Sequence, residues 1–304
     1  MSIPPERPRF SIIIPTYNNT PVLKKCLNSL CRQAVDTSYF EVIVINDGDE
    51  EELPSKLESL GMQIALRCLR QAHRGPAAAR NLGIQAARGE IILFLDDDSL
   101  PTENWLRSMM AAWERSDDVE GIGGFTACEP GDSLVCKVNA EIFNWYLRVN
   151  SDGRSSSFLS THNAGYRAAV LKQIGRFDER FLGAAGEDRD LCLKITLAGG
   201  KLRLDETILV NHDRDLNLKK FIRKYYGYGK ASRAITMRYP EMKRLSGQAY
   251  LRLLSSAFRG DKTPPERILA LPLAVLSQAA TLAGYLADRL AGVKSVRQRS
   301  SEKI

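Results

Sequence analysis

The sequence lacks paired cysteines and a secretory signal. None of its six cysteines belongs to a C-x-x-C pair, and most fall within apolar periodic stretches. We therefore expect reduced core thiols, as in a cytoplasmic protein, rather than a disulfide framework. Residues 1–10 lack the apolar core of a secretory signal, so we expect the globular part of the chain to stay in the cytosol.

Acidic residues are scarce in one part of the chain. From residue 213 to the end there are 19 Lys and Arg against 7 Asp and Glu, whereas residues 1–212 carry 24 against 29. The net charge of +7 is therefore the sum of an acidic region and a basic region, which we expect to bind different partners. Because 304 residues are long for one average domain, we predict an α/β domain over residues 1–212 and a basic helical appendage over residues 213–304.

The first third of the chain contains four strand-sized apolar runs, each followed by a polar turn. The runs lie at residues 10–14, 40–45, 64–69 and 91–95, and apolar residues at helical spacing lie between them. This order predicts a mostly parallel sheet flanked by helices, with the carboxyl ends of its strands along one edge. The residues that would gather there are Pro15, Thr16, Tyr17, Asn46, Asp47, Arg70, Asp96, Asp97 and Asp98.

Three consecutive carboxylates, Asp96 to Asp98, follow the fourth run without a break. Their mutual repulsion is usually offset by a cation with oxygen ligands, such as Mg²⁺ or Mn²⁺ shared with a phosphate. Asp96 and Asp98 could both turn toward one ion. The alternative is a solvated turn in which Ser99 or Thr102 caps a helix. These two interpretations are evenly matched for the carboxylates alone, and the recurrence of polar strand ends favours the binding site.

Two polar residues lie near the middle of the helix predicted over residues 77–87. Arg80 and Asn81 could reach a diphosphate at the same edge of the sheet. The alternative for both is an ordinary solvated helix face. The neighbouring polar strand ends favour the diphosphate.

Four segments resemble the successive signatures of family 2 glycosyltransferases of the GT-A fold. They are IIIPTYN at 12–18, VIVINDG at 42–48, GPAAARNLG at 75–83 and GEIILFLDDD at 89–98. The resemblance extends through His212, about two thirds of the chain. It implies a nucleotide-sugar donor, a divalent cation on Asp96 and Asp98, and inversion at the anomeric carbon. Asn46 departs from the pattern, since many relatives carry aspartate there, although an amide can also hydrogen-bond a uracil edge.

The resemblance also implies roles for residues farther along the chain. Asn163, in THNAGYR at 161–167, matches a segment that meets the transferred sugar and the acceptor, whereas for His162 we prefer a local turn. In GAAGEDRDL at 183–191 the pattern implies that Asp188 is the catalytic base, with Glu187 as a capping and loop-positioning group. The alternative is that these carboxylates only stabilise the start of a helix, where the helix dipole would lower their pKa values. His212 matches a family histidine that completes the metal and diphosphate site.

The basic region after residue 212 has features that suit two different kinds of partner. Lys, Arg and aromatic residues alternate in residues 218–237, which suits RNA or a membrane interface. Residues 268–287 carry no charge and are long enough to span a bilayer, but Pro272, Ser277 and Gln278 suit a helix lying in the interface. A buried core helix is the alternative. The basic flanks favour the cytoplasmic face of an anionic membrane.

The sequence as a whole predicts an inverting glycosyltransferase. It would move a sugar from a nucleoside diphosphate sugar, which we expect to be UDP-linked, to an acceptor hydroxyl that could be lipid-linked, in cell-surface polysaccharide or glycolipid synthesis. A nucleotidyltransferase would need a glycine-rich basic loop after Ile14, which is absent. A nucleotide-sugar-binding protein without activity would need to lack Asp188. An RNA-binding protein is disfavoured by the acidic first two thirds, so we expect no nucleic-acid partner.

Overall fold

The structure is a computed structural model that describes residues 7–48, 53–129, 131–181, 185–212, 216–242, 253 and 264–301. The chain divides into two compact units. One contains residues 1–127 and 146–213, and the other contains residues 128–145 and 214–304. Residues 128–145, which the sequence analysis kept in the first domain, thus belong to the second unit. All six cysteines lie in the described part of the chain and are free thiols.

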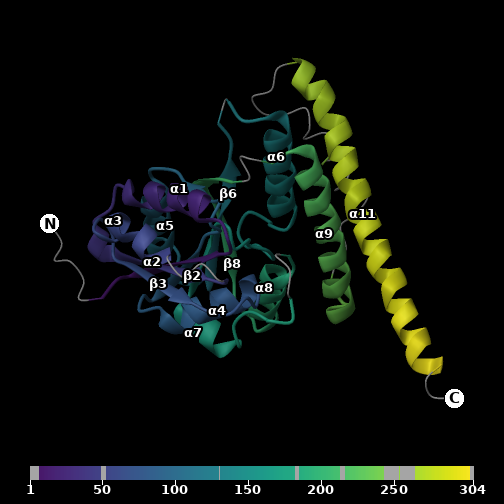
Figure 1. Cartoon of the computed structure of the whole chain (residues 1–304), viewed down its shortest axis with the longest axis horizontal. Helices are drawn as coiled ribbons and strands as arrows, with labels where there is room; N and C mark the ends of the chain where they lie inside the picture. The colour runs from purple at the N-terminus through teal and green to yellow at the C-terminus, as the bar shows by residue number, and fades with distance from the viewer. Residues whose placement is uncertain are drawn as a thin grey trace. The chain divides into compact units, whose positions relative to one another are not determined.

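An eight-stranded sheet forms the centre of the first unit (Figure 1), in the order β3-β2-β1-β4-β7-β6-β8-β5. The strands are β1 (Phe10–Thr16), β2 (Phe40–Asn46), β3 (Leu66–Arg70), β4 (Ile91–Phe94), β5 (Leu100–Pro101), β6 (Gly121–Ala127), β7 (Ala164–Arg167) and β8 (Leu202–Asn211). Strands β1 to β4 are parallel, whereas β7 is antiparallel to both β4 and β6. Because β8 is parallel to β6, the carboxyl ends of β4, β6 and β8 share one edge with the amino end of β7.

Helices cover both faces of this sheet. They are α1 (Thr20–Cys31), α4 (Pro76–Ala86), α5 (Trp105–Glu114), α7 (Ala168–Gln173) and α8 (Glu187–Leu197), with the short α2 (Leu53–Lys56), α3 (Glu58–Gly61) and η1 (Thr37–Tyr39). The predicted mostly parallel α/β sheet is confirmed. The strand predicted over residues 208–210 is much longer, since it starts at Leu202.

The surroundings of strand β1 show why nearly all of its residues are apolar. Ile12 and Ile14 pack in a core cluster with Leu23 of α1. Ile13 lies on the opposite face, where a Cβ on Gly83 of α4 would collide with it. Since each face of the strand meets a helix, nearly all of its residues are apolar. The buried Ser11 is the exception, and it donates a hydrogen bond of 2.7 Å to Glu41 Oε1. Polar side chains gather in the turn at the carboxyl end of the strand.

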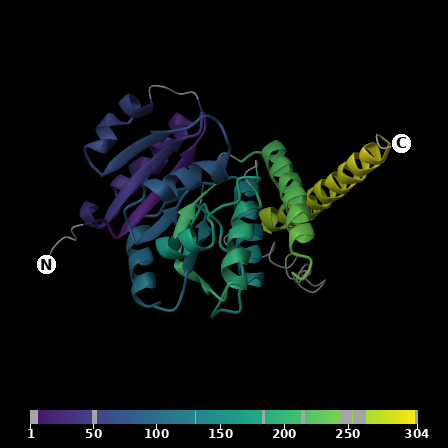
Figure 2. The same ribbon diagram turned by 90° about the horizontal axis from the view of Figure 1, so that it is seen from below.

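The second unit is helical. It contains α9 (Leu218–Arg238), α11 (Pro264–Ser301) and the first part of α6 (Leu134–Val149). Helices α9 and α11 lie side by side (Figure 2) and approach closely at glycines, because a Cβ on Gly229 would collide with the Thr281 backbone and one on Gly284 with the Tyr226 backbone. Residues 266–290 are long and apolar enough to cross a membrane, judged by length and composition only, and 28% of the most apolar window is buried.

Candidate active site

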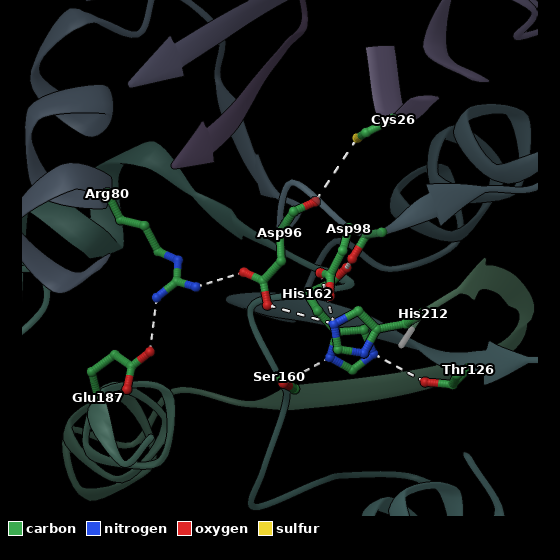
Figure 3. Close-up of polar contacts among 10 residues, drawn as sticks. Cys26, Arg80, Asp96, Asp98, Thr126, Ser160, His162, Glu187 and His212 are labelled. Carbon is green, nitrogen blue, oxygen red and sulfur yellow. Dashed lines mark hydrogen bonds and ion pairs between the residues drawn. The ribbon is translucent and has the colours of Figure 1, made fainter. Parts of the chain in front are cut away.

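The candidate cation ligands converge at the shared sheet edge (Figure 3). His212 Nε2 lies 3.1 Å from Asp98 Oδ1 and 3.9 Å from Asp96 Oδ2. The topology explains this convergence, because Leu100 of β5 pairs with Asn211 of β8 and so draws the two flanking segments together. One ligand atom from each residue lies within 4.8 Å of the others. Two carboxylates and an imidazole form a donor set that could hold Mg²⁺ or Mn²⁺.

Asp97 points away from this cluster. Its Oδ2 accepts a hydrogen bond of 2.7 Å from the Thr16 hydroxyl at the end of β1. Burial raises the pKa of Asp97 to about 6, and the Thr16 hydroxyl acts in the opposite direction. Asp97 therefore ties the acidic turn to β1, whereas Asp96 and Asp98 face His212.

Arg80 connects the cation cluster to helix α8. It is 2% exposed and donates to Asp96 Oδ1 at 2.7 Å and to Glu187 Oε1 at 2.8 Å. Its guanidinium also lies 5.7 Å from the centre of the Phe177 ring. A buried cation between two carboxylates offsets the cost of removing their charges from water. Arg80 thus joins the edge of the sheet to the start of α8.

Glu187 and Asp188 occupy the first turn of α8, which follows Gly186 in the left-handed region at φ 99°. Burial raises the pKa of Glu187 to about 7, the charge of Asp188 adds to this, and Arg80 opposes it. Burial also raises the pKa of the half-buried Asp188, against the lowering effect of Arg80, the Arg189 backbone N–H and the Ser160 hydroxyl. From the sequence we expect the helix dipole to lower the pKa of Asp188. Burial outweighs the dipole.

Asp47 organises the loop before α4. Its carboxylate accepts hydrogen bonds of 2.8 Å from the backbone N–H groups of Arg74 and Gly75, and one of 2.7 Å from the Gln71 side chain. Asn46 Oδ1 accepts from the Gly48 backbone N–H at 3.1 Å. Asn46 and Asp47, which we predicted to bind the nucleoside, therefore use these side-chain oxygens to stabilise the loops in which they lie.

Tyr17 is the exposed part of the same region. It is 51% exposed and stacks on His73, with ring centres 4.1 Å apart. Pro15 and Thr16 end β1 opposite Ile45 and Asn46 of β2. The structure therefore brings the predicted nucleoside-side residues to one place and presents one aromatic face partly to solvent.

Two other predicted binding residues are engaged within the framework. The amide of Asn81 bonds to both the backbone N–H and the carbonyl of Phe177, and to the Glu179 side chain. Asn163 is 1% exposed, accepts from the Trp105 indole N–H at 2.8 Å and donates to the carbonyl oxygens of Phe125 and Ile208. Both side chains hold loops together.

Ser160, Thr126 and His162 also lie at this site, although no sequence pattern pointed to Ser160 or Thr126 or to this position of His162. The His162 ring stacks on His212, with ring centres 4.5 Å apart and planes 7° apart. Its Nδ1 lies 3.0 Å from Ser160 Oγ and its Nε2 lies 3.1 Å from Thr126 Oγ1. A backbone turn closes here, because the Asn163 N–H donates to the Ser160 carbonyl at 3.0 Å. The side-chain-to-backbone turn expected for His162 stays a prediction. No sequence pattern placed this turn beside α8.

The sequence matches a known protein family over much of its length. The sequence model of glycosyl transferase family 2 matches residues 11–175, more than half of the chain. The chain belongs to glycosyl transferase family 2. The resemblance seen in the four sequence segments is therefore confirmed.

Curated relatives share part of their length with this chain. The pre-mycofactocin glycosyltransferase of Mycobacterium tuberculosis is 27% identical over 240 residues, which cover 76% of this chain and 48% of that protein. The uncharacterized glycosyltransferase YwdF of Bacillus subtilis is 31% identical over 170 residues, covering 56% of this chain and 62% of that protein. This family 2 chain thus spans about half to two thirds of these relatives.

Solved structures confirm the GT-A fold. The mannosyltransferase PcManGT from Pyrobaculum calidifontis, in complex with GDP-Man and Mn²⁺, has a TM-score of 0.58 and 20% identity, covering 96% of this chain and 81% of that one. S. aureus TarS 1-349 in complex with UDP-GlcNAc has a TM-score of 0.55 and 19% identity, with coverage of 95% and 92%. At these sequence identities the structural likeness is evidence for the fold of this family 2 chain, and only for the fold.

The buried pairing of Arg80 predicts a pH-dependent loss of stability. Replacing Arg80 by Met leaves the buried Glu187 carboxylate without its cation, and breaking a buried pair costs about 3 to 5 kcal/mol. Because the pKa of Glu187 is about 7, this carboxyl is mostly neutral at low pH and needs the cation less. Urea denaturation should therefore show a larger loss for Arg80→Met at pH 8 than at pH 5.5.

A second variant supplies the control. Adding Glu187→Gln to Arg80→Met removes the stranded charge, so it should recover part of the stability at pH 8. Equal losses at both pH values, with no recovery in the double variant, would show that Arg80 does not compensate a buried Glu187 charge.

Proposed function

We propose that this chain is an inverting glycosyltransferase that moves a sugar from a nucleoside diphosphate sugar, UDP-linked in our prediction, to an acceptor hydroxyl. The observation that carries the proposal is the Arg80 bridge, which places the Asp96, Asp98 and His212 cluster beside the start of α8, where Asp188 lies. The likeness to structures that hold GDP-Man with Mn²⁺ or UDP-GlcNAc supports it. Chondroitin synthase of Escherichia coli, 27% identical over 235 residues, supports a role in cell-surface polysaccharide or glycolipid synthesis.

Asp96, Asp98 and His212 would hold the divalent cation. The two partly exposed carboxylates match the oxygen donors that Mn²⁺ and Mg²⁺ prefer, and the imidazole of His212 adds a third ligand atom. The bound cation would neutralise the charge that develops on the diphosphate leaving group. Arg80 bonds to Oδ1 of Asp96 while Oδ2 lies nearer His212. We therefore assign Arg80 to orienting Asp96, instead of the direct diphosphate contact expected from the sequence.

Asp188 would act as the base. As the acceptor oxygen bonds to the anomeric carbon, the acceptor proton passes to the Asp188 carboxylate and the bond from that carbon to the diphosphate breaks. Attack opposite the leaving group inverts the configuration. The raised pKa of Asp188 makes it a stronger base than an exposed aspartate. Its half-buried position leaves it accessible to a hydroxyl.

Tyr17 is the best candidate for contact with the base of the nucleotide, because its ring is half exposed beside the Asn46 turn. An aromatic face offers stacking to any base. Pro15, Thr16 and Asp47 would shape this surface. Asn81 and Asn163, engaged by backbone partners, would act as framework residues that hold the loops around the donor.

We also propose that helix α11 binds an anionic membrane. Ile268, Val275 and Leu282 recur every seven residues and are 70%, 51% and 58% exposed, so they form an outward apolar stripe. Ala270 and Ala274 on the other side are buried in the core cluster of this unit. A helix with one packed face and one free apolar face suits the membrane interface. The excess of basic residues after residue 213 fits anionic headgroups.

The first prediction concerns the cation. Asp98→Ala should abolish the Mn²⁺-dependent part of UDP binding in calorimetry, because it removes one of the three donors. Asp118→Ala, which alters an acidic residue paired only at the surface with Lys201, is the control and should bind normally. Unchanged Mn²⁺-dependent affinity in a folded Asp98→Ala protein rules out this cation site.

The second prediction concerns the base. A panel of UDP-linked and GDP-linked sugars with Mn²⁺ identifies the donor from the nucleoside diphosphate released. Asp188→Asn keeps the size of the side chain and its ability to accept from the Arg189 N–H, but removes basicity. Turnover should fall by on the order of 100-fold or more, with donor affinity retained. Retained turnover would assign the base elsewhere.

The third prediction concerns the membrane. Replacing Ile268, Val275 and Leu282 together by Gln removes the apolar stripe without touching the packed face. Sedimentation of the full chain with vesicles rich in phosphatidylserine should then fall sharply, while Met62→Gln, at an 85% exposed site in the first unit, should behave as wild type. High salt should release the wild-type protein only in part, because apolar burial is not screened.

Two outcomes contradict the membrane proposal. Wild-type protein that ignores anionic vesicles has no such surface. A triple variant that binds vesicles normally but changes from dimer to monomer in sedimentation velocity shows that the stripe is an interface between copies of the chain.

A further inference from the structure

A cavity lies at the edge of the sheet opposite the candidate active site. Strands β1 and β4 are parallel and pair Phe10 with Ile91 at their amino ends, whereas the antiparallel β7 pairs Arg167 with Ile91 at its carboxyl end. The segments before β1 and β4 therefore meet the start of α7, which follows β7 directly. These segments and the end of α4 border a cavity of about 600 Å³, which is the size of a small-molecule site.

The walls of this cavity combine apolar surface with positive charge. Ile84 of α4 and Ile92 of β4 are buried side chains that supply part of the apolar wall. The charged part consists of Arg7, Arg88 and Lys172, which come from three different segments. No carboxylate of the described residues lines the cavity. Such a lining favours a ligand that carries both a negative charge and an apolar body.

The three cations of the cavity are not compensated by the protein. Within the part of the chain that the structure describes, none of their side chains forms an ion pair or a hydrogen bond. Other arginines at the same edge of the sheet are engaged, because Arg9 pairs with Glu114 and Arg67 pairs with Glu41. Like charges that share a cavity repel one another, and a bound anion removes that repulsion.

The backbone that carries Arg88 is held in place. The Arg88 N–H donates to Glu41 Oε1 at 2.7 Å, and the Gly89 N–H donates to Ser11 Oγ at 2.8 Å. A Cβ on Gly89 would lie only 2.7 Å from backbone atoms of Phe10 and Ser11, so this close approach to β1 requires glycine. Because the main chain is already ordered, an anion that binds the guanidinium has only the side chain to order.

We propose that this basic cavity binds a small organic anion, a phosphate or carboxylate that carries a short apolar chain. The anionic group pairs with Arg7, Arg88 and Lys172, and the apolar wall covers the chain. This site is separate from the donor site, because the cavity lies at the amino end of β4 whereas Asp96 and Asp98 follow its carboxyl end. The proposal requires no assumption about the transfer reaction.

Calorimetry with three probes tests the chemistry of the lining. The full-length protein should bind hexyl phosphate, and high salt should weaken this binding. Inorganic phosphate lacks the chain and should bind about 10-fold more weakly or worse. Hexyl glucoside lacks the charge and should give no measurable binding. If hexyl glucoside binds as tightly as hexyl phosphate, or hexyl phosphate does not bind, the proposal is overturned.

Two double variants locate the binding site. Arg88→Gln together with Lys172→Gln removes two of the three cations and should weaken hexyl phosphate binding by about 10-fold or more, since each lost contact is a hydrogen bond to a charged group. Lys25→Gln together with Arg32→Gln, at exposed positions in α1 and at its end, lowers the net charge equally and should bind as the wild type does. Unchanged affinity in the first variant overturns the proposal.

Thermal unfolding shows that the cavity variant is folded. Both double variants alter exposed side chains, so without ligand they should melt close to the wild type. Hexyl phosphate should then raise the Tm of the wild type and of the α1 variant, because it binds only the folded protein, and should not raise the Tm of the cavity variant. An equal rise in all three proteins places the binding elsewhere and contradicts the proposal.

Vesicles distinguish a dissolved anion from a lipid headgroup. The cavity variant should sediment with phosphatidylserine vesicles as the wild type does if the ligand is a dissolved molecule. Loss of both vesicle binding and hexyl phosphate binding assigns the same cavity to the phosphate of a lipid. Loss of vesicle binding with unchanged affinity for hexyl phosphate shows that these cations serve only a membrane surface, and the proposed anion site is then wrong.

Discussion

Arg80 lies 2.7 Å from Asp96 and 2.8 Å from Glu187 while only 2% of its surface is exposed. A carboxylate cannot be buried at the start of α8 unless a cation compensates it, and the same cation orients one member of the candidate metal cluster. The place of α8 and the nearness of Asp188 to the cluster both depend on this pairing, which also opposes the rise that burial causes in the pKa of Glu187. For this reason we regard Arg80 as a structural link more than as a substrate contact.

The direction of β7 is the second constraint. Because β7 runs antiparallel between β4 and β6, the turn that precedes it lies at the same edge as the residues that follow β4, β6 and β8. That single reversal brings His162 to the edge where Thr126 of β6, His212 after β8 and the acidic turn already lie. A fully parallel sheet would place the end of β7 there instead, and the residues of the 160–163 turn would lie at the opposite edge.

The second unit is held together by helix–helix packing. Its helices α9 and α11 meet at glycines, which lets their backbones approach closely, and α11 keeps an apolar stripe outside that contact. The pattern of residues 268–287 predicted an uncharged helix but left open whether it spans a membrane, lies on one or forms a core. The packed face against α9 disfavours a helix surrounded by lipid on all sides, and the exposed face disfavours a core helix.

The sequence by itself determined the elements and their chemistry. Apolar runs ending in polar turns located β1 to β4 to within two residues at every end, and the order of the motifs identified the family, because both depend on local pattern. It also grouped Asp96, Asp98 and His212, whose ligand atoms lie within 4.8 Å of one another in the structure. Only the tertiary structure decided how polar atoms are used. Arg80 and Glu187 are 107 residues apart, and Asp97 meets Thr16 across 81 residues. The amides of Asn81 and Asn163 hold backbone groups, and His162 joins Thr126 to Ser160. Such pairings are set by which strands become neighbours and by the burial that results, and burial also raised the pKa of Asp188 where the local helix dipole alone would lower it.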